Sequence, residues 1–303
     1  MSETTPLLKT PIHRARTLQR MLGFEALYLK LECRNRTGTH KDRAAAAAVE
    51  EAVCLGAPGV TVGTCGNFGV ALAHCASRVG LPCRVFVPIH YSNERVVEMV
   101  AEGCALEKVR GTYEHAVEES GRFATRSGFY DANPSGSGGV RALAAYSGIA
   151  RELLQDLPDV PASVWVSAGN GTTLAGIHRG FEAIGLEPRV CGVASRGNSA
   201  LIDSARCGRV VELDPADIVE TAVNEPVVAW RAYHCAEALQ ALRSTRGWMY
   251  GATDQELVAS AVLLSRAEGV ESIPASAGAL AGFQASAPDV LDRRATHVLV
   301  LTG

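Results

Sequence analysis

One lysine of this chain stands where its side chain could attack a carbonyl group. Lys41 lies in the segment Asn35-Arg36-Thr37-Gly38-Thr39-His40-Lys41-Asp42-Arg43, between a short polar turn and the start of a predicted helix. The chain has four lysines against twenty-five arginines, so a general preference for lysine at the surface does not explain the lysine at position 41. An arginine cannot lose its proton to attack a carbonyl carbon, whereas a lysine can once burial lowers its pKa. Lys41 is therefore the candidate catalytic residue, with a solvated first-turn lysine as the alternative.

A second set of residues has the composition of a phosphate-binding loop. Its members follow a predicted buried strand and open a predicted helix: Gly169, Asn170, Gly171, Thr172 and Thr173. Glycines let backbone N–H groups approach an anion, threonine hydroxyls add donors, and a helix N-terminus supplies partial positive charge. The loop lacks the full glycine pattern of a dinucleotide site and the lysine of a P-loop. It predicts phosphate binding, with an ordinary strand-to-helix turn as the alternative.

A third turn, Thr64-Cys65-Gly66-Asn67-Phe68-Gly69, also follows a predicted strand. Its N–H groups could hold a carboxylate, and the Asn67 amide could hydrogen-bond a ring substituent. The candidate substrate-binding residues here are Thr64, Cys65, Gly66 and Asn67. Together the three turns supply a carbonyl-reactive amine, a phosphate site and a carboxylate site, a set that fits pyridoxal 5′-phosphate (PLP).

The elements around these turns predict an α/β fold. Predicted strands are Tyr28–Glu32, Val60–Thr64, Arg84–Pro88, Ala105–Val109, Val164–Ala168, Arg189–Ala194 and His297–Leu301. Predicted helices are Asp42–Cys54, Val70–Val79, Asn93–Glu102, Tyr113–Arg126, Arg141–Asp156, Thr173–Ile184, Asp254–Glu268 and Ser276–Ala285. This alternation is typical of parallel sheets covered by helices, in which ligands bind beyond the carboxyl ends of the strands.

The length of the chain and one glycine-rich stretch indicate two lobes, each a mostly parallel sheet covered by helices. Glycines between Asn133 and Gly139 permit large backbone changes, so we expect a hinge or the edge of an active site there, with a static loop as the alternative. We expect a large cofactor-binding domain formed by residues 1–33 and 138–303, and a small mobile domain formed by residues 34–137.

Composition excludes several classes of function. The formal net charge of -3 gives no electrostatic reason to expect nucleic acid or a membrane surface as partner. No apolar run approaches the roughly 20 residues of a membrane span. The residues after Met1 also lack the apolar core of a signal peptide, so we expect a cytoplasmic protein. The nine cysteines form no C-x-x-C pair, which predicts free thiols and no metal site.

The chain resembles the PLP-dependent enzymes of fold type II, the tryptophan synthase β-like family, and within them is most similar to threonine synthase. Thr37–Arg43 is similar to the family's T-G-S-F-K-D-R, with Lys41 at the Schiff-base lysine and His40 in place of the phenylalanine. The resemblance implies that Asn67 hydrogen-bonds the PLP 3-hydroxyl and that the loop from Gly169 to Thr173 holds the phosphate. It also implies that Thr302 faces the pyridine nitrogen and that the segment from Ser272 to Ala277 approaches the ring.

The activity implied by the resemblance is elimination or replacement on a small amino acid, with Lys41 also acting as general base. Threonine-synthase-like chemistry ranks first, before a serine or threonine ammonia-lyase and a cysteine-synthase-like β-replacement enzyme. Arg141 is the candidate to hold a substrate phosphate, together with Lys108 and Arg110. A homodimer is implied as well. The alternative of another class is a PLP-fold protein that binds a small molecule without turnover.

Overall fold

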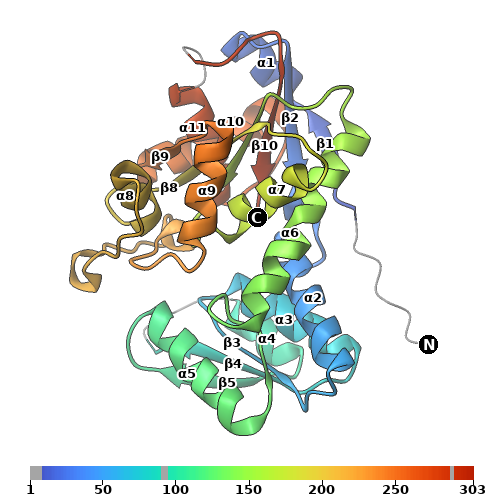
Figure 1. Ribbon diagram of the computed structural model, residues 1–303, viewed down its shortest axis with the longest axis vertical. Coiled ribbons are helices and arrows are strands. Elements are labelled where there is room, and N and C mark those ends of the chain that lie inside the picture. The colour runs from blue at the N-terminus through green and yellow to red at the C-terminus, as the bar shows by residue number, and fades with distance from the viewer. Residues whose placement is uncertain (1–8, 90–94, 287–289) are drawn as a thin grey trace. The chain divides into compact units, whose positions relative to one another are not determined.

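The computed structural model describes residues 9–89, 95–286 and 290–303, and the chain divides into two compact units (Figure 1). Of the described residues, the first unit contains Asn35–Ala145, and the second contains Lys9–Arg34 together with Tyr146–Gly303. The division falls inside helix α6 (Ser137–Asp156), after Ala145, whereas the sequence analysis placed it after residue 137, at the first residue of that helix. One continuous helix therefore contributes residues to both units.

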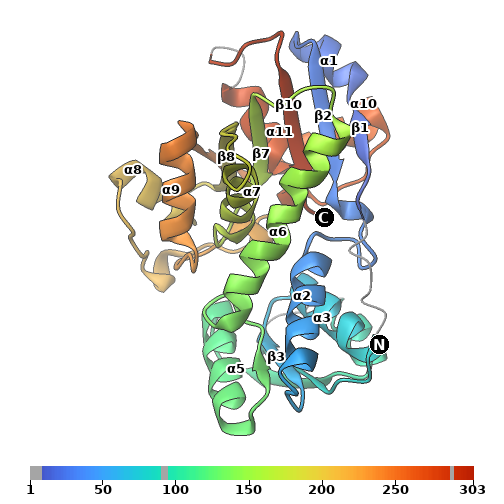
Figure 2. The ribbon, with the colours of Figure 1, turned by 45° about the vertical axis from the view of Figure 1, so that its right-hand side comes forward.

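The first unit is built on a four-stranded parallel sheet with the order β5-β4-β3-β6. Its strands are β3 (Val60–Gly63), β4 (Cys83–Pro88), β5 (Ala105–Val109) and β6 (Tyr130–Asp131). Figure 2 shows two helices on one side of β3, α2 (Lys41–Cys54) and α3 (Asn67–Arg78), and α5 (Tyr113–Ser127) on the other. The short helix α4 (Val96–Ala101) packs against α3. β3 is buried along its whole length, as a strand covered on both faces must be.

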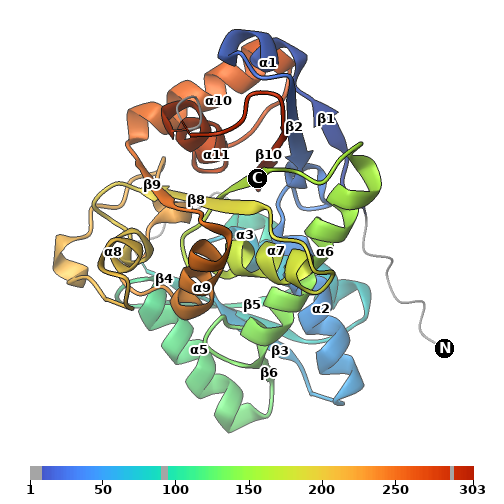
Figure 3. The ribbon, with the colours of Figure 1, turned by 45° about the horizontal axis from the view of Figure 1, so that its top comes forward.

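The second unit is built on a six-stranded sheet with the order β1-β2-β10-β7-β8-β9, in which only the β1–β2 pair is antiparallel. Its strands are β1 (Ile12–Arg14), β2 (Ala26–Leu31), β7 (Ser163–Ser167), β8 (Arg189–Ser195), β9 (Met249–Ala252) and β10 (Thr296–Leu301). Figure 3 shows α10 (Asp254–Glu268) and α11 (Pro274–Ser286) on one side of β8, and α7 (Thr172–Glu182) and α9 (Cys235–Thr245) on the other. Helix α1 (Arg16–Leu22) packs against α10, and α8 (Ala200–Cys207) packs against α9.

The predicted fold class is confirmed, because both sheets are mostly parallel and carry helices on both faces. Each predicted strand and helix is present with ends shifted by a few residues; the predicted helix Asn93–Glu102 begins outside the described residues. The sequence analysis missed β1, β6, β9, α1, α8 and α9. Strands of two to four residues are too short to show a period, which explains the first three. Within the described ranges, no helix is both long and apolar enough to cross a membrane.

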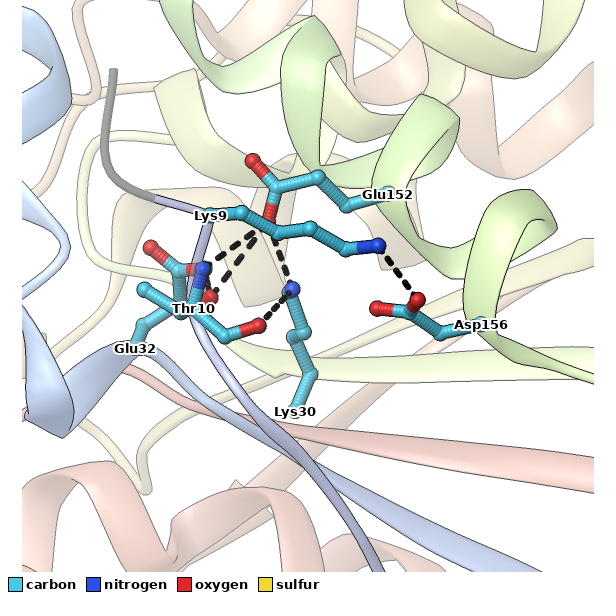
Figure 4. Close-up of polar contacts among 6 residues, drawn as sticks. All are labelled: Lys9, Thr10, Lys30, Glu32, Glu152 and Asp156. Atoms are coloured by element: carbon cyan, nitrogen blue, oxygen red, sulfur yellow. Dashed lines mark hydrogen bonds and ion pairs between the residues drawn. The ribbon is translucent and has the colours of Figure 1, made fainter. Parts of the chain in front are cut away.

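A buried polar network ties α6 and the segment before β1 to strand β2 (Figure 4). Lys30, on β2, is fully buried, and its ammonium donates to Glu152 Oε2 of α6 at 2.6 Å and to the Thr10 carbonyl at 2.6 Å. Thr10 donates from its hydroxyl to Glu32 at 2.6 Å and from its N–H to Glu152 at 3.2 Å. The buried positive charge is therefore compensated by a carboxylate that is itself hydrogen-bonded.

All nine cysteines are free, as predicted. Burial raises the pKa of the Cys75 and Cys191 thiols to about 12, and that of Cys104 to about 11. These thiols therefore stay protonated at neutral pH, and a protonated buried thiol is inert as a nucleophile.

Candidate functional site

Lys41 is the first residue of α2 and follows a tight turn that its neighbours hold in place. Gly38 adopts φ +83°, a left-handed conformation that glycine reaches without a Cβ clash. The Asp42 carboxylate accepts the Thr37 N–H at 2.8 Å and the Thr37 hydroxyl as well. The Lys41 N–H donates to Thr39 Oγ1 at 3.2 Å. Hydrogen bonds of the residues before and after Lys41 thus fix its backbone and the direction of its Cα–Cβ bond.

His40 occupies the N-cap position of α2 without a side-chain capping bond, and it is 9% exposed. It is therefore buried in the way expected of the phenylalanine it replaces.

The turn from Thr64 to Gly66 connects β3 to α3, as the glycine pattern predicted. Gly66 has φ +152° and ψ −81°, a combination that only glycine adopts readily, and Asn67 is the first residue of α3. The Gly66 N–H donates to Thr64 Oγ1 at 3.1 Å, and Thr64 is buried. Three of the predicted substrate residues, Thr64, Cys65 and Gly66, therefore form one turn at the carboxyl end of β3.

An arginine that the sequence analysis did not identify joins the Lys41 turn to the Asn67 turn. Arg95 Nη1 donates to Asn67 Oδ1 at 2.6 Å, and Nη2 donates to the Thr37 carbonyl at 2.7 Å. Glu98 accepts from the same guanidinium at 2.8 and 3.0 Å, and this hydrogen bonding holds the pKa of Glu98 below its usual value. Because a guanidinium only donates, Asn67 must present its oxygen to Arg95, and its NH₂ group points the other way.

Arg95 has no sequence signal comparable to the lysine motif. It lies 28 residues beyond Asn67 and belongs to no glycine-rich or charged cluster. Only the packing of α4 against α3 brings its side chain to the turn.

In the second unit, the residues Gly169 to Gly171 connect β7 to α7. Gly171 has φ +80°, and a Cβ there would lie 2.9 Å from both the Ala238 Cβ and the His234 carbonyl oxygen. No side chain caps α7, so its first-turn N–H groups, with the hydroxyls of Thr172 and Thr173, form a set of donors. Such donors at a helix N-terminus fit a phosphate, which offers only acceptors at its oxygens.

Thr302 lies at the same edge of the sheet as this loop. It follows β10, which is the parallel neighbour of β7, so both strands end on the same side. The Gly303 N–H donates to Ser276 Oγ at 3.0 Å, and the Ser272 hydroxyl donates to the Gly303 carbonyl at 2.8 Å. The Ser167 hydroxyl, at the end of β7, donates to the Ser276 carbonyl at 3.3 Å. The second unit thus gathers the predicted phosphate loop, Thr302 and the segment after Ser272 at one edge.

The structure does not bring Arg141 to the Lys41 turn. Its guanidinium binds both oxygens of Glu51, at 2.5 and 2.6 Å, and this bond is the largest cause that lowers the pKa of Glu51. Glu51 lies ten residues after Lys41 on α2, or ~15 Å along the helix axis. Lys108 lies on the edge strand β5, and Arg110 follows that strand; both are exposed.

Comparison with known proteins identifies the family of the chain. Residues 4–303 match the family described as pyridoxal-phosphate dependent enzyme. Threonine synthase from Methanocaldococcus jannaschii is 28% identical over 303 residues, which cover 97% of this chain and 74% of that protein.

Two solved structures show the same fold. A pyridoxal 5′-phosphate-dependent aspartate racemase has a TM-score of 0.85 at 22% identity, covering 98% of this chain and 90% of that one. The processed form of threonine deaminase isoform 2 from Solanum lycopersicum has a TM-score of 0.84 at 19% identity, covering 98% of this chain and 79% of that one. Because the family match spans almost the whole chain, the predicted family and cofactor are confirmed, and the chain belongs to the pyridoxal-phosphate dependent enzymes.

Proposed function

We propose that the chain catalyses elimination or replacement on a small amino acid in the manner of a threonine synthase. One observation carries the proposal. Within one unit, a lysine at a helix start and an asparagine turn are joined by a single arginine, in the motif order of threonine synthases. The similarity to the threonine synthase of Methanocaldococcus jannaschii supports the reaction class.

Lys41 has two roles in this proposal. Its amine would hold the cofactor covalently, and the same amine would act as general base toward the proton on the substrate Cα. PLP, when bound, supplies an electron sink for the pair left at Cα. The bonds around Lys41 hold its backbone and so fix the point from which its side chain extends.

Asn67 orients the cofactor ring from the first unit. With its Oδ1 held by Arg95, the Asn67 NH₂ group is the donor for the oxygen at ring position 3. The neighbouring turn from Thr64 to Gly66 offers N–H groups for the substrate carboxylate. Arg141 is left out of the proposed substrate site because its guanidinium is bound to Glu51.

The second unit supplies its own proposed cofactor-binding residues. The loop from Gly169 to Thr173 binds the phosphate, and the Thr302 hydroxyl faces the pyridine nitrogen. A hydroxyl at this place would offer the nitrogen no charged partner and would therefore favour its unprotonated form. The weaker electron sink that results favours elimination and replacement over transamination.

The absorbance spectrum of the protein with PLP, before and after borohydride reduction, tests the proposal. We expect a visible band that reduction traps on Lys41, and a Lys41→Arg variant that neither shows the band nor takes the label. Trapping on Lys9, Lys30 or Lys108 instead would refute the assignment.

A substrate panel then tests the reaction class. Phosphohomoserine, serine, threonine, and O-acetylserine with sulfide distinguish threonine formation from ammonia release and from β-replacement. We expect threonine from phosphohomoserine. If serine or threonine instead releases a keto acid and ammonia, the assigned activity would be that of an ammonia-lyase. No product from any substrate, with cofactor bound, would favour a binding protein. The resemblance also leads us to infer a cytoplasmic homodimer, which light scattering and localisation of a tagged chain test.

A further inference from the structure

His234 contacts the loop from Gly169 to Thr173 through three of its own groups. Its ring Nδ1 lies 2.9 Å from Thr172 Oγ1, and both side chains are buried. Its N–H donates to the Asn170 carbonyl at 3.0 Å. Its carbonyl oxygen would lie 2.9 Å from a Cβ on Gly171, so it closes the space beside that residue.

The pKa of the His234 ring lies below its ordinary value, which favours the neutral form. Burial is the largest cause that lowers its pKa, with Arg179 acting in the same direction and Glu237 in the opposite one. A neutral imidazole has one N–H group, so the bond to Thr172 can be made in two ways. Either the Thr172 hydroxyl donates to Nδ1, or an Nδ1–H group donates to Thr172 Oγ1.

These two arrangements have different consequences for an anion at the start of α7. When Thr172 donates to the ring, its hydroxyl proton is used and its oxygen lone pairs remain, which repel a phosphate oxygen. When the ring donates to Thr172, the hydroxyl proton is available to a ligand. Thr172 is the first residue of α7, where a hydroxyl adds to the N–H donors of the helix.

We propose that His234 is a positioning residue for the cofactor phosphate: its Nδ1–H donates to Thr172 Oγ1 and turns the Thr172 hydroxyl proton toward a phosphate oxygen. The inference rests on the proposed function, since it requires that the loop from Gly169 to Thr173 hold the PLP phosphate. His234 touches no part of the cofactor in this role and acts through Thr172 alone.

Binding of PLP compared with pyridoxal, which lacks the phosphate, isolates this role. The dissociation constants of both are measured by absorbance titration of the full chain freed of cofactor. His234→Leu removes the ring N–H, and Thr172→Val removes the hydroxyl with little change of volume. We expect each to weaken PLP roughly 10-fold, the range of one hydrogen bond to a charged group, and to leave pyridoxal binding unchanged.

Two further variants separate positioning from structure. His234→Asn keeps an N–H group near the place of Nδ1, so PLP binding should return to within about 3-fold of the natural chain. The double variant His234→Leu/Thr172→Val should bind PLP no more weakly than either single variant, because both remove the same bond. If His234→Leu fails to fold, as read by circular dichroism, Thr172→Val and His234→Asn carry the test.

The outcomes distinguish this inference from the function on which it rests. Equal weakening of PLP and pyridoxal, or additive losses in the double variant, would overturn the positioning role while the proposed function stands. A natural chain that binds pyridoxal as tightly as PLP would refute both, because the loop would then hold no phosphate.

Discussion

Removing the charge of Glu152 should destabilise the second unit more than any surface substitution. In the natural chain the Lys30 ammonium is fully buried and has two acceptors at 2.6 Å, Glu152 Oε2 and the Thr10 carbonyl (Figure 4). Glu152→Gln keeps the shape of the side chain and an oxygen for Thr10. It leaves a buried ammonium with neutral acceptors only.

The size of the effect follows from burial. Breaking one side of a buried ion pair costs about 3–5 kcal/mol, because the remaining charge cannot reach water. The Glu152 side chain is 12% exposed, and Glu32 places a second carboxylate in the network, so we expect the lower end of that range. For a unit of this size, about 3 kcal/mol lowers the midpoint of thermal unfolding by roughly 6–12 °C.

Differential scanning calorimetry at pH 7 measures this change, with Asp156→Asn as the matched control. Asp156 pairs with Lys9 at 2.5 Å, but the Lys9 side chain is 48% exposed, so the control should lose less than about 1 kcal/mol. The double variant Lys30→Met/Glu152→Gln removes both charges and should regain at least half of the loss.

Two results would refute this reasoning. A loss in Glu152→Gln no greater than that in Asp156→Asn would mean that the buried ammonium finds another counter-charge or water. A double variant less stable than Glu152→Gln would mean that packing of the Lys30 stem, rather than its charge, makes the contribution.

Three further predictions concern the site and the fold. Arg95→Met should weaken PLP binding roughly 10-fold and shift the absorbance maximum, because the Asn67 amide loses its fixed orientation. Glu98→Gln is the control. An unchanged spectrum of Arg95→Met would contradict the role of Arg95 in orienting Asn67. Gly63→Ala should lower the free energy of unfolding by at least about 2 kcal/mol, because its Cβ would meet the backbone of α5. A Cβ on Gly121, inside α5, would make only an ordinary contact 3.6 Å from Asp131 Oδ2, so Gly121→Ala should be neutral or stabilising. Equal effects of the two substitutions would contradict the packing argument. The free energy of unfolding should fall as the pH drops from about 7.5 to 5, because burial lowers the pKa of three histidines below 6.5 and the unfolded chain then binds more protons. These are His178, His234 and His297. Urea unfolding across this range measures the slope, and a flat profile would argue against it.

The chain's local patterns already contained the fold class and the lysine turn. Alternating apolar runs and helical stretches predict parallel sheets, and glycines after strands predict turns at the carboxyl ends of β3 and β7. These signals are readable because side-chain period and turn chemistry act over a few residues. Lys41, Gly66 and Gly171 could be found this way, since each owes its place to its immediate neighbours.

Tertiary structure alone decided which distant side chains form hydrogen bonds with the residues of those turns. Arg95 reaches Asn67 across 28 residues, and His234 reaches Thr172 across 62, with no pattern linking either pair in the chain. Packing can also remove a predicted residue from a site. Arg141 has the charge of a phosphate-binding residue, but its guanidinium binds Glu51, which lies 90 residues earlier in the chain. Whether a charged side chain is available to a ligand depends on the partner that packing places beside it. That partner is set by the topology of the sheets, which no short segment of sequence contains.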